Sequence, residues 1–205
     1  MQLFHSCWIA AAIAVGASAA LAQGPSAPPP WPAAHDDPPV LEADPVHPLL
    51  LGPVRILLDS TTFADVRRAT GAGEPSRHGK GTEALDWLCF TLADAQPAQR
   101  VWLTSSELAG FGKIDGVTAV ELGVGEKATA ACPELPARFR PVRFEDGLWL
   151  GQLGGEQRKA MAVPAQGSSS WGGLYHGTLA GLDKVGAIAV EVRKARAVSI
   201  HLARN

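Results

Sequence analysis

The chain has 205 residues, of which 46% are hydrophobic and 19% are charged, and its net charge is −2. This is the composition of an ordinary globular protein with one large or two small domains. The small net charge and the lack of a dense cluster of Lys and Arg argue against nucleic acid or an anionic membrane surface as the partner.

The beginning of the chain has the features of an export signal. WIAAAIAVGASAALA is an apolar run of the length of a signal core, and it ends in Ala20-Leu21-Ala22, which fits the small-x-small rule of signal peptidases. No Lys or Arg precedes this run. We predict a signal peptide over residues 1–22, a periplasmic or secreted protein, and no membrane span once the signal is cleaved. The alternative is that the segment is retained as an uncleaved anchor.

Residues 23–48 are predicted to be a linker. The segment GPSAPPPWPAAHDDPPVLEADPVHP is dense in proline, which lacks the amide donor that helices and sheets need and favours an extended chain. Trp31, within PPPWP, is a candidate recognition anchor, and the alternative is that the whole segment is a solvated tether.

A first structural unit is predicted over residues 49–126. It opens with PVRILL, which has the apolar character of a short strand. Thr62, with Asp65 three residues later, forms a pattern that caps the start of a helix. Gly71 and the following Pro75 predict the end of that helix.

Three strand-like segments follow this helix, over residues 84–92, 99–108 and 117–124. The first is nearly continuous in apolar residues, which indicates a central, buried strand. Turn-rich sequence separates the second from the third. Because consecutive strands joined by turns pair with each other, we expect an antiparallel meander with the helix packed on one face.

The predicted mature chain holds two cysteines, Cys89 in the first of these strands and Cys132 in a connector predicted over residues 127–141. Two cysteines in an exported protein most often form a disulfide. Neither a CxxC motif nor paired histidines point to a redox or zinc site. We predict a Cys89–Cys132 disulfide that closes a loop of about 43 residues.

The order of elements recurs in a second predicted unit over residues 142–205. LWLGQLGGEQRKAMAVP, from Leu148 to Pro164, reads as a strand followed by a weaker helix. Three strand-like segments come after it: residues 171–179, 187–192 and 197–203. The sequence therefore predicts an α+β fold of two tandem units, each a short strand and a helix followed by an antiparallel three-stranded meander.

The pattern of a short strand, Thr-Thr-x-x-Asp-Val, a helix ending in Gly and a following Pro resembles small modules of the bacterial envelope. These are the SmpA/OmlA-type outer-membrane assembly lipoprotein and the β-lactamase-inhibitor-protein fold. The matching residues are Thr61, Thr62, Asp65, Val66, Gly71 and Pro75, and more loosely Leu150, Gly151, Glu156 and Pro164. In the inhibitor fold two such units lie in tandem, so the resemblance implies a concave sheet surface.

The motifs of common catalytic and metal sites are absent from the sequence. GEPSRHGKGT departs from the spacing of a phosphate-binding loop, and GSSSWGG lacks the second glycine of a nucleophile elbow. The histidines occur singly, with no H-x-H or HExxH pair. We therefore predict no catalytic residue, no cofactor and no metal ligand.

Two stretches carry candidate binding residues. Trp171, Tyr175 and His176 occupy a glycine-rich segment of the second unit, and Arg77 and His78 occupy the corresponding loop of the first. Aromatic and Arg side chains are common anchors of protein interfaces. The alternative is that Trp171 and Tyr175 pack in the core of the second unit. We expect the same of three other tryptophans in their cores: Trp87, Trp102 and Trp149.

These observations favour an exported binding or envelope-associated module whose partner is an unknown protein or envelope component. Two alternatives remain: a periplasmic or secreted hydrolase that uses Ser, His or acidic groups of the polar loops, and a structural or assembly factor of the envelope. A hydrolase requires a pocket in which a nucleophile and an ionisable group converge. A binding module requires an exposed apolar or aromatic patch.

Overall fold

The computed structural model describes residues 27–30, 40–41, 48–106, 110, 112–145, 147–156, 170–179 and 182–204. The strands within these ranges are β1 (Val40–Leu41), β2 (Leu49–Leu51), β3 (Val54–Ile56), β4 (Ser76–His78), β5 (Leu85–Leu92), β6 (Gln99–Ser106), β7 (Gly116–Glu121), β8 (Val142–Phe144), β9 (Trp171–Leu179), β10 (Leu182–Arg193) and β11 (Arg196–Arg204). The helices are α1 (Phe63–Thr70), η1 (Gly81–Glu83) and η3 (Ala137–Phe139), and residues 154–156 are also helical.

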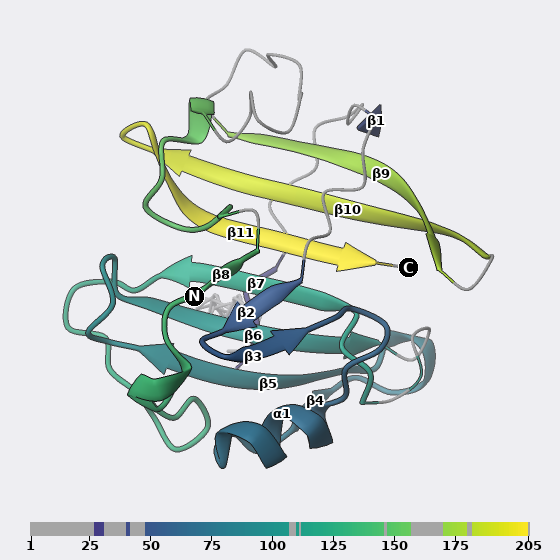
Figure 1. The fold of residues 1–205 in the computed structure, drawn as a ribbon, viewed down its shortest axis with the longest axis horizontal. Helices are drawn as coiled ribbons and strands as arrows, with labels where there is room; N and C mark the ends of the chain where they lie inside the picture. Colours follow the sequence, from purple (N-terminus) through teal and green to yellow (C-terminus); the bar gives the residue numbers. More distant parts are fainter. Residues whose placement is uncertain are drawn as a thin grey trace, which may run out of the picture.

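Eight of these strands form one large sheet in the order β1-β9-β10-β11-β7-β6-β5-β4 (Figure 1). Strands β5 to β7 form one antiparallel meander, and strands β9 to β11 form a second. The meanders are joined edge to edge by antiparallel pairing of β7 with β11, where Ala119 is the partner of Ile200. At the other end of the second meander, β1 adds a short parallel strand to β9.

A small sheet of three strands, in the order β3-β2-β8, lies over one face of the large sheet (Figure 1). Leu49 of β2 pairs with Ile56 on one side and with Phe144 on the other. All three side chains are buried, which places them against the large sheet. Since the paired residues of β2 and β8 are more than 90 positions apart, this sheet ties the two halves of the chain together.

Helix α1 begins and ends where the local sequence predicts. Thr62 Oγ1 accepts a hydrogen bond from Asp65 N at 3.2 Å, and Thr62 N donates to Asp65 Oδ2 at 3.1 Å, which completes a reciprocal capping box. Gly71 follows the last turn with a φ of 69°, a left-handed conformation that glycine adopts without strain. Phe63 and Val66 face the core.

One continuous cluster of buried apolar side chains fills the space between the two sheets and α1. The large sheet contributes residues from both meanders, including Leu88, Phe90, Ile188 and Ile200. Leu148, Trp149 and Leu150 also belong to this cluster, and the ring of Trp149 packs edge-on against Phe144 with centroids 5.7 Å apart.

The predicted fold class is wrong. The described chain is mostly β-structure, and one sheet spans both predicted units, so they are not two separate strand-helix modules. Strands β7 and β11 would otherwise be exposed edges, and pairing with each other satisfies their backbone groups. The short strands β2 and β8 then pair together and cover the shared core. The second predicted helix is seen only at residues 154–156, and its remainder lies outside the described residues.

Candidate binding surface

The candidate site is the face of the large sheet that points away from the core, which we call the outer face. Side chains alternate along each strand, so the core residues Leu88 and Phe90 place Trp87 and Cys89 on this other face. Cross-strand partners share a face. The register therefore defines two neighbouring rows: Cys89, Trp102, Thr118, His201 and Ala189 in one, and Trp87, Thr104, Gly116, Ala203 and Ala187 in the other.

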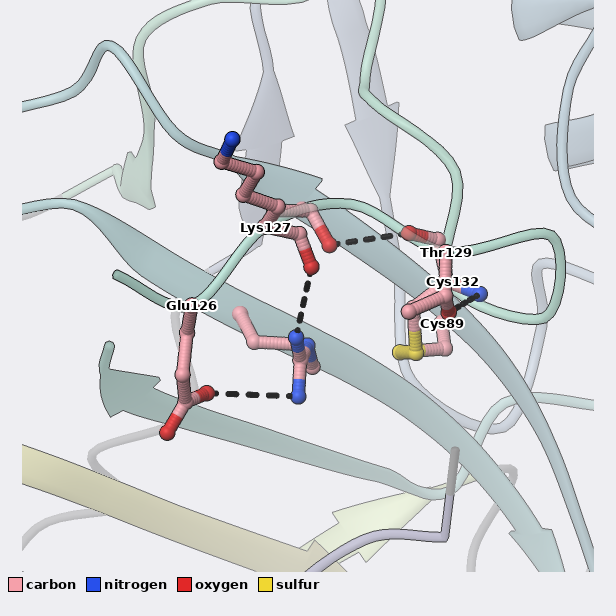
Figure 2. The surroundings of a disulfide bond; sticks show 7 residues. Cys89, Glu126, Lys127, Thr129 and Cys132 are labelled. Carbon is pink, nitrogen blue, oxygen red and sulfur yellow. Dashed lines mark hydrogen bonds and ion pairs between the residues drawn. A yellow bond between two sulfur atoms is a disulfide. The ribbon is translucent and has the colours of Figure 1, made fainter. Parts of the chain in front are cut away.

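A second buried cluster lies on the outer face and contains Trp87, Cys89, Trp102 and Cys132. The predicted Cys89–Cys132 disulfide is present, with Cα atoms 4.7 Å apart (Figure 2). Trp87 and Trp102 are each 5% exposed. Within the described part of the chain, the buried indole Nε1 of Trp87 has no hydrogen-bond partner, which is uncommon for a polar group removed from water.

The connector after β7 lies against the outer face on one side of this cluster. Arg100 NH2 donates to the carbonyl oxygen of Lys127 at 3.1 Å, and its other terminal nitrogen lies 3.6 Å from a carboxylate oxygen of Glu126. Thr91 Oγ1 donates to the carbonyl oxygen of Cys132 at 2.9 Å. These contacts and the disulfide fix the connector over the outer face where β5 ends and β6 begins (Figure 2).

The N-terminal segment of residues 27–30 lies against the other side of the cluster, although this range was predicted to be part of a linker. Ala27 packs against the tryptophan–disulfide cluster. Pro28, Pro29 and Pro30 line a pocket of about 320 Å³ whose opposite wall includes outer-face residues. Ala27, Pro28 and Pro29 are half-buried and Pro30 is exposed, so the segment is only partly enclosed.

The pocket beside this segment has both apolar and polar residues in its lining. Thr104, Ser106, Asp115 and Thr118 all line it. Asp115 Oδ2 accepts hydrogen bonds from Ser106 N at 2.8 Å and from Ser106 Oγ. Burial raises the pKa of the Asp115 carboxyl, although the hydrogen bonds from Ser106 oppose this effect. A Cβ atom at Gly116 would collide with Thr104 Oγ1, so glycine is needed for the close approach of this hydroxyl.

The groups around the pocket are poorly suited to hydrolysis. Thr118 Oγ1 lies 3.4 Å from His201 Nδ1, which brings a hydroxyl next to an imidazole on the outer face. However, burial lowers the pKa of His201 to about 4, against the opposing charge of Glu191. A base with so low a pKa takes up protons poorly at neutral pH. The described residues also contain no cluster of His, Cys, Asp and Glu that could hold a metal ion.

The structure does not bring the predicted binding residues together. Trp171, Tyr175 and His176 lie on β9, whereas Arg77 and His78 lie on β4 at the far edge of the large sheet. Six strand spacings of about 4.8 Å separate the two groups by roughly 29 Å. Their binding roles stay predictions, but they do not form one compact site.

Each predicted group has a defined place in the sheet. In register, Trp171 is the partner of Val190, and His176 is the partner of Val185. The guanidinium of Arg77 is bound by Asp86 on the neighbouring strand, at 2.6 and 2.7 Å. The charge of Arg77 is therefore already neutralised within the protein, whereas His78 is exposed.

Trp87, Trp102 and residues 27–30 form the surface that sequence reasoning missed. Both tryptophans were expected in a core, and they are buried, but on the outer face rather than between the two sheets. Two features of the sequence indicate this arrangement. Trp87 and Cys89 are two residues apart on one strand and therefore share a face. The predicted disulfide places the connector against that same face.

Comparisons with known proteins leave the chain without a family. No protein-family model matches the sequence, and searches of curated proteins and of solved structures find no similar chain. The resemblance to tandem envelope modules therefore stays a prediction. In the part of the chain that the structure describes, no helix has the length and apolar character of a membrane-spanning segment.

Proposed function

We propose that this chain is an exported protein-binding module that holds an extended segment of a partner protein on its outer face. One observation carries the proposal: residues 27–30 of the chain itself already lie there, with Ala27 against the tryptophan–disulfide cluster and the three prolines lining the adjacent pocket. A surface that accommodates one such segment offers the shape and the contacts for another.

The disulfide supports export. A bond between Cys89 and Cys132 persists in oxidising compartments such as the periplasm or the extracellular space and is rare in the cytosol. The apolar run before residue 22, with its small-x-small ending, is consistent with delivery to such a compartment. We place the mature protein in the periplasm or outside the cell.

The character of the outer face favours a protein ligand over a small substrate. Trp87 and Trp102 are buried in the cluster against which Ala27 packs, and displacement of residues 27–30 would make available apolar area of the kind that dominates the energy of protein interfaces. Hydroxyl groups of Thr104, Ser106 and Thr118 line the adjacent pocket and suit the hydrogen-bonding groups of a peptide backbone. The connector and the disulfide hold β5 and β6 in place, so the surface is formed before a ligand binds.

A display selection of random peptides tests this proposal. The targets are the mature chain, residues 23–205, and the same chain with Pro28, Pro29 and Pro30 replaced by Ser. We expect enriched peptides whose affinity falls at least tenfold with Ala203→Arg, because Ala203 lines the pocket. Leu57→Arg is the matched control, since Leu57 is 43% exposed and belongs to neither row of the outer face.

The proposal fails if neither target enriches peptides, or if binding is equally insensitive to Ala203→Arg and Leu57→Arg. Melting temperatures of all variants establish that they fold. If Ala203→Arg does not fold, Thr104→Arg serves the same purpose, because Thr104 is half-buried and lines the same pocket.

A further inference from the structure

We infer that residues 27–30 are an internal occupant of a site for proline-rich segments, and that a proline-rich segment of a partner protein binds by displacing them. This inference rests on the proposed function, and it names the class of ligand and the regulation of the site. The chain therefore carries its own competitor, tethered beside the surface that it blocks.

The chemistry of the internal segment defines the ligand class. Ala27-Pro28-Pro29-Pro30 has no backbone N–H at its three prolines, and each proline ring fixes φ near the polyproline value. Such a segment is extended before it binds, leaves its carbonyl oxygens free and loses little entropy on docking. Domains that recognise proline-rich segments offer aromatic surfaces to the rings.

The outer face provides what such a segment requires. Ala27, at the start of the segment, packs against the buried cluster that contains Trp87 and Trp102, so displacement of the segment would uncover aromatic side chains at that end. The indole Nε1 of Trp87, a residue that is only 5% exposed, is a donor with no acceptor among the described residues. A proline-rich ligand has acceptors and few donors, so the two surfaces are complementary.

The internal segment satisfies this site incompletely. A pocket of about 320 Å³ remains between the prolines and the sheet, and Pro30 is exposed. With the segment in place, Trp87 Nε1 still has no hydrogen-bond partner in the ranges that the structure describes. Trp87 does not line this pocket, but it is the cross-strand partner of Thr104, which does. A ligand that fills the pocket and also extends over Trp87 to accept from its indole would therefore bind more favourably than the segment that it replaces.

Tethering explains how a loosely fitting segment can still occupy the site. A segment on the same chain is present at a high effective concentration, so a weak contact is sufficient to keep the site closed. An external ligand then binds with an apparent affinity that is reduced by the fraction of chains in which the site is open. Release of the segment should raise the measured affinity without any new contact.

The experiment uses the chain's own sequence as the probe. A synthetic peptide, Ser-Ala-Pro-Pro-Pro-Trp-Pro, with the sequence of residues 26–32, is titrated calorimetrically into the mature chain and into the variant with Pro28, Pro29 and Pro30 replaced by Ser. We expect the variant to bind the peptide about tenfold more tightly or better. Its Trp87 indole N–H resonance, assigned with Trp87→Phe, should shift on titration.

The controls separate this inference from the proposed function. A peptide with serine in place of every proline should not bind, and Ala203→Arg in the open variant should abolish binding of the proline peptide. Equal affinity of the two chains, or an unmoved Trp87 resonance, overturns the inference. If the open variant selects only proline-free peptides that depend on Ala203, the proposed function stands and the ligand class is wrong.

Concentration-dependent dimers of the unaltered chain that disappear in the open variant would identify a second copy as the occupant and overturn the partner assignment.

Discussion

Ala119 of β7 and Ile200 of β11 are direct partners in the register that joins the two meanders, and both side chains are fully buried. The pair belongs to the core that also receives residues from the small sheet and from α1. Because the backbone pairing and the core beneath it are both shared, neither half of the chain holds a complete core of its own.

Replacement of Ile200 by Ala should therefore destabilise the whole molecule. We expect a loss of about 2–5 kcal/mol in the free energy of unfolding, since a fully buried side chain would leave a cavity. Calorimetry and tryptophan fluorescence should report one coincident transition in both proteins. Leu57→Ala, at a position 43% exposed, should change stability far less. Two separate transitions, of which Ile200→Ala shifts one, would contradict the shared core.

The local elements of this fold were accessible from the sequence, and their assembly was not. Apolar runs bounded by turns identified the meander strands, and the capping box with Gly71 identified α1. The pairing of β7 with β11 connects residues about 80 positions apart, and no local pattern encodes which edge meets which. A short strand such as β8 equally carries no signal that its partner is β2.

The candidate surface was also not predictable from local sequence patterns. An apolar run with few polar positions predicts a buried strand but does not distinguish its two faces, so Trp87 and Trp102 were assigned to the core. Proline-rich sequence predicts an extended segment without indicating whether it is solvated or docked. The contact between residues 27–30 and the outer face arises only in the folded chain.

The disulfide gives a direct chemical prediction. Thiol labelling of the unfolded, non-reduced mature chain should find no free cysteine, and two after reduction. The double substitution of Cys89 and Cys132 by Ala should lower the free energy of unfolding by about 4 kcal/mol, because the bond closes a loop between residues 43 positions apart. Detection of two thiols before reduction would refute the bond.

The capping box of α1 predicts a stability change and a pKa change together. Thr62→Ala should lower the free energy of unfolding by about 1 kcal/mol, because the amide of Asp65 loses its side-chain acceptor. The hydrogen bonds from Thr62 hold the pKa of Asp65 below its ordinary value of 3.8, so the same substitution should raise that pKa. An NMR titration of the Asp65 carboxyl measures the pKa. Thr62→Ser keeps the hydroxyl and should leave both quantities nearly unchanged.

His201 should make the protein sensitive to mild acid. It is 3% exposed, and burial lowers its pKa from 6.5 to about 4. Between these values the unfolded chain binds a proton that the folded chain excludes, so stability is retained above pH 6.5 and is lost as the pH falls toward 4. Over that whole interval, protonation of His201 in the unfolded chain lowers the free energy of unfolding by about 3 kcal/mol.

His201→Gln isolates this contribution, because glutamine does not titrate. Urea unfolding at pH 7 should find the variant less stable than the parent chain, since the substitution disturbs a buried position on the outer face. At pH 4.5 the difference between the two proteins should shrink by about 2.5 kcal/mol, because only the parent is penalised by protonation in the unfolded state. Asp115, whose raised pKa makes stability fall with rising pH, is common to both proteins and cancels in the comparison. A difference that stays constant between the two pH values would show that His201 titrates normally in the folded chain.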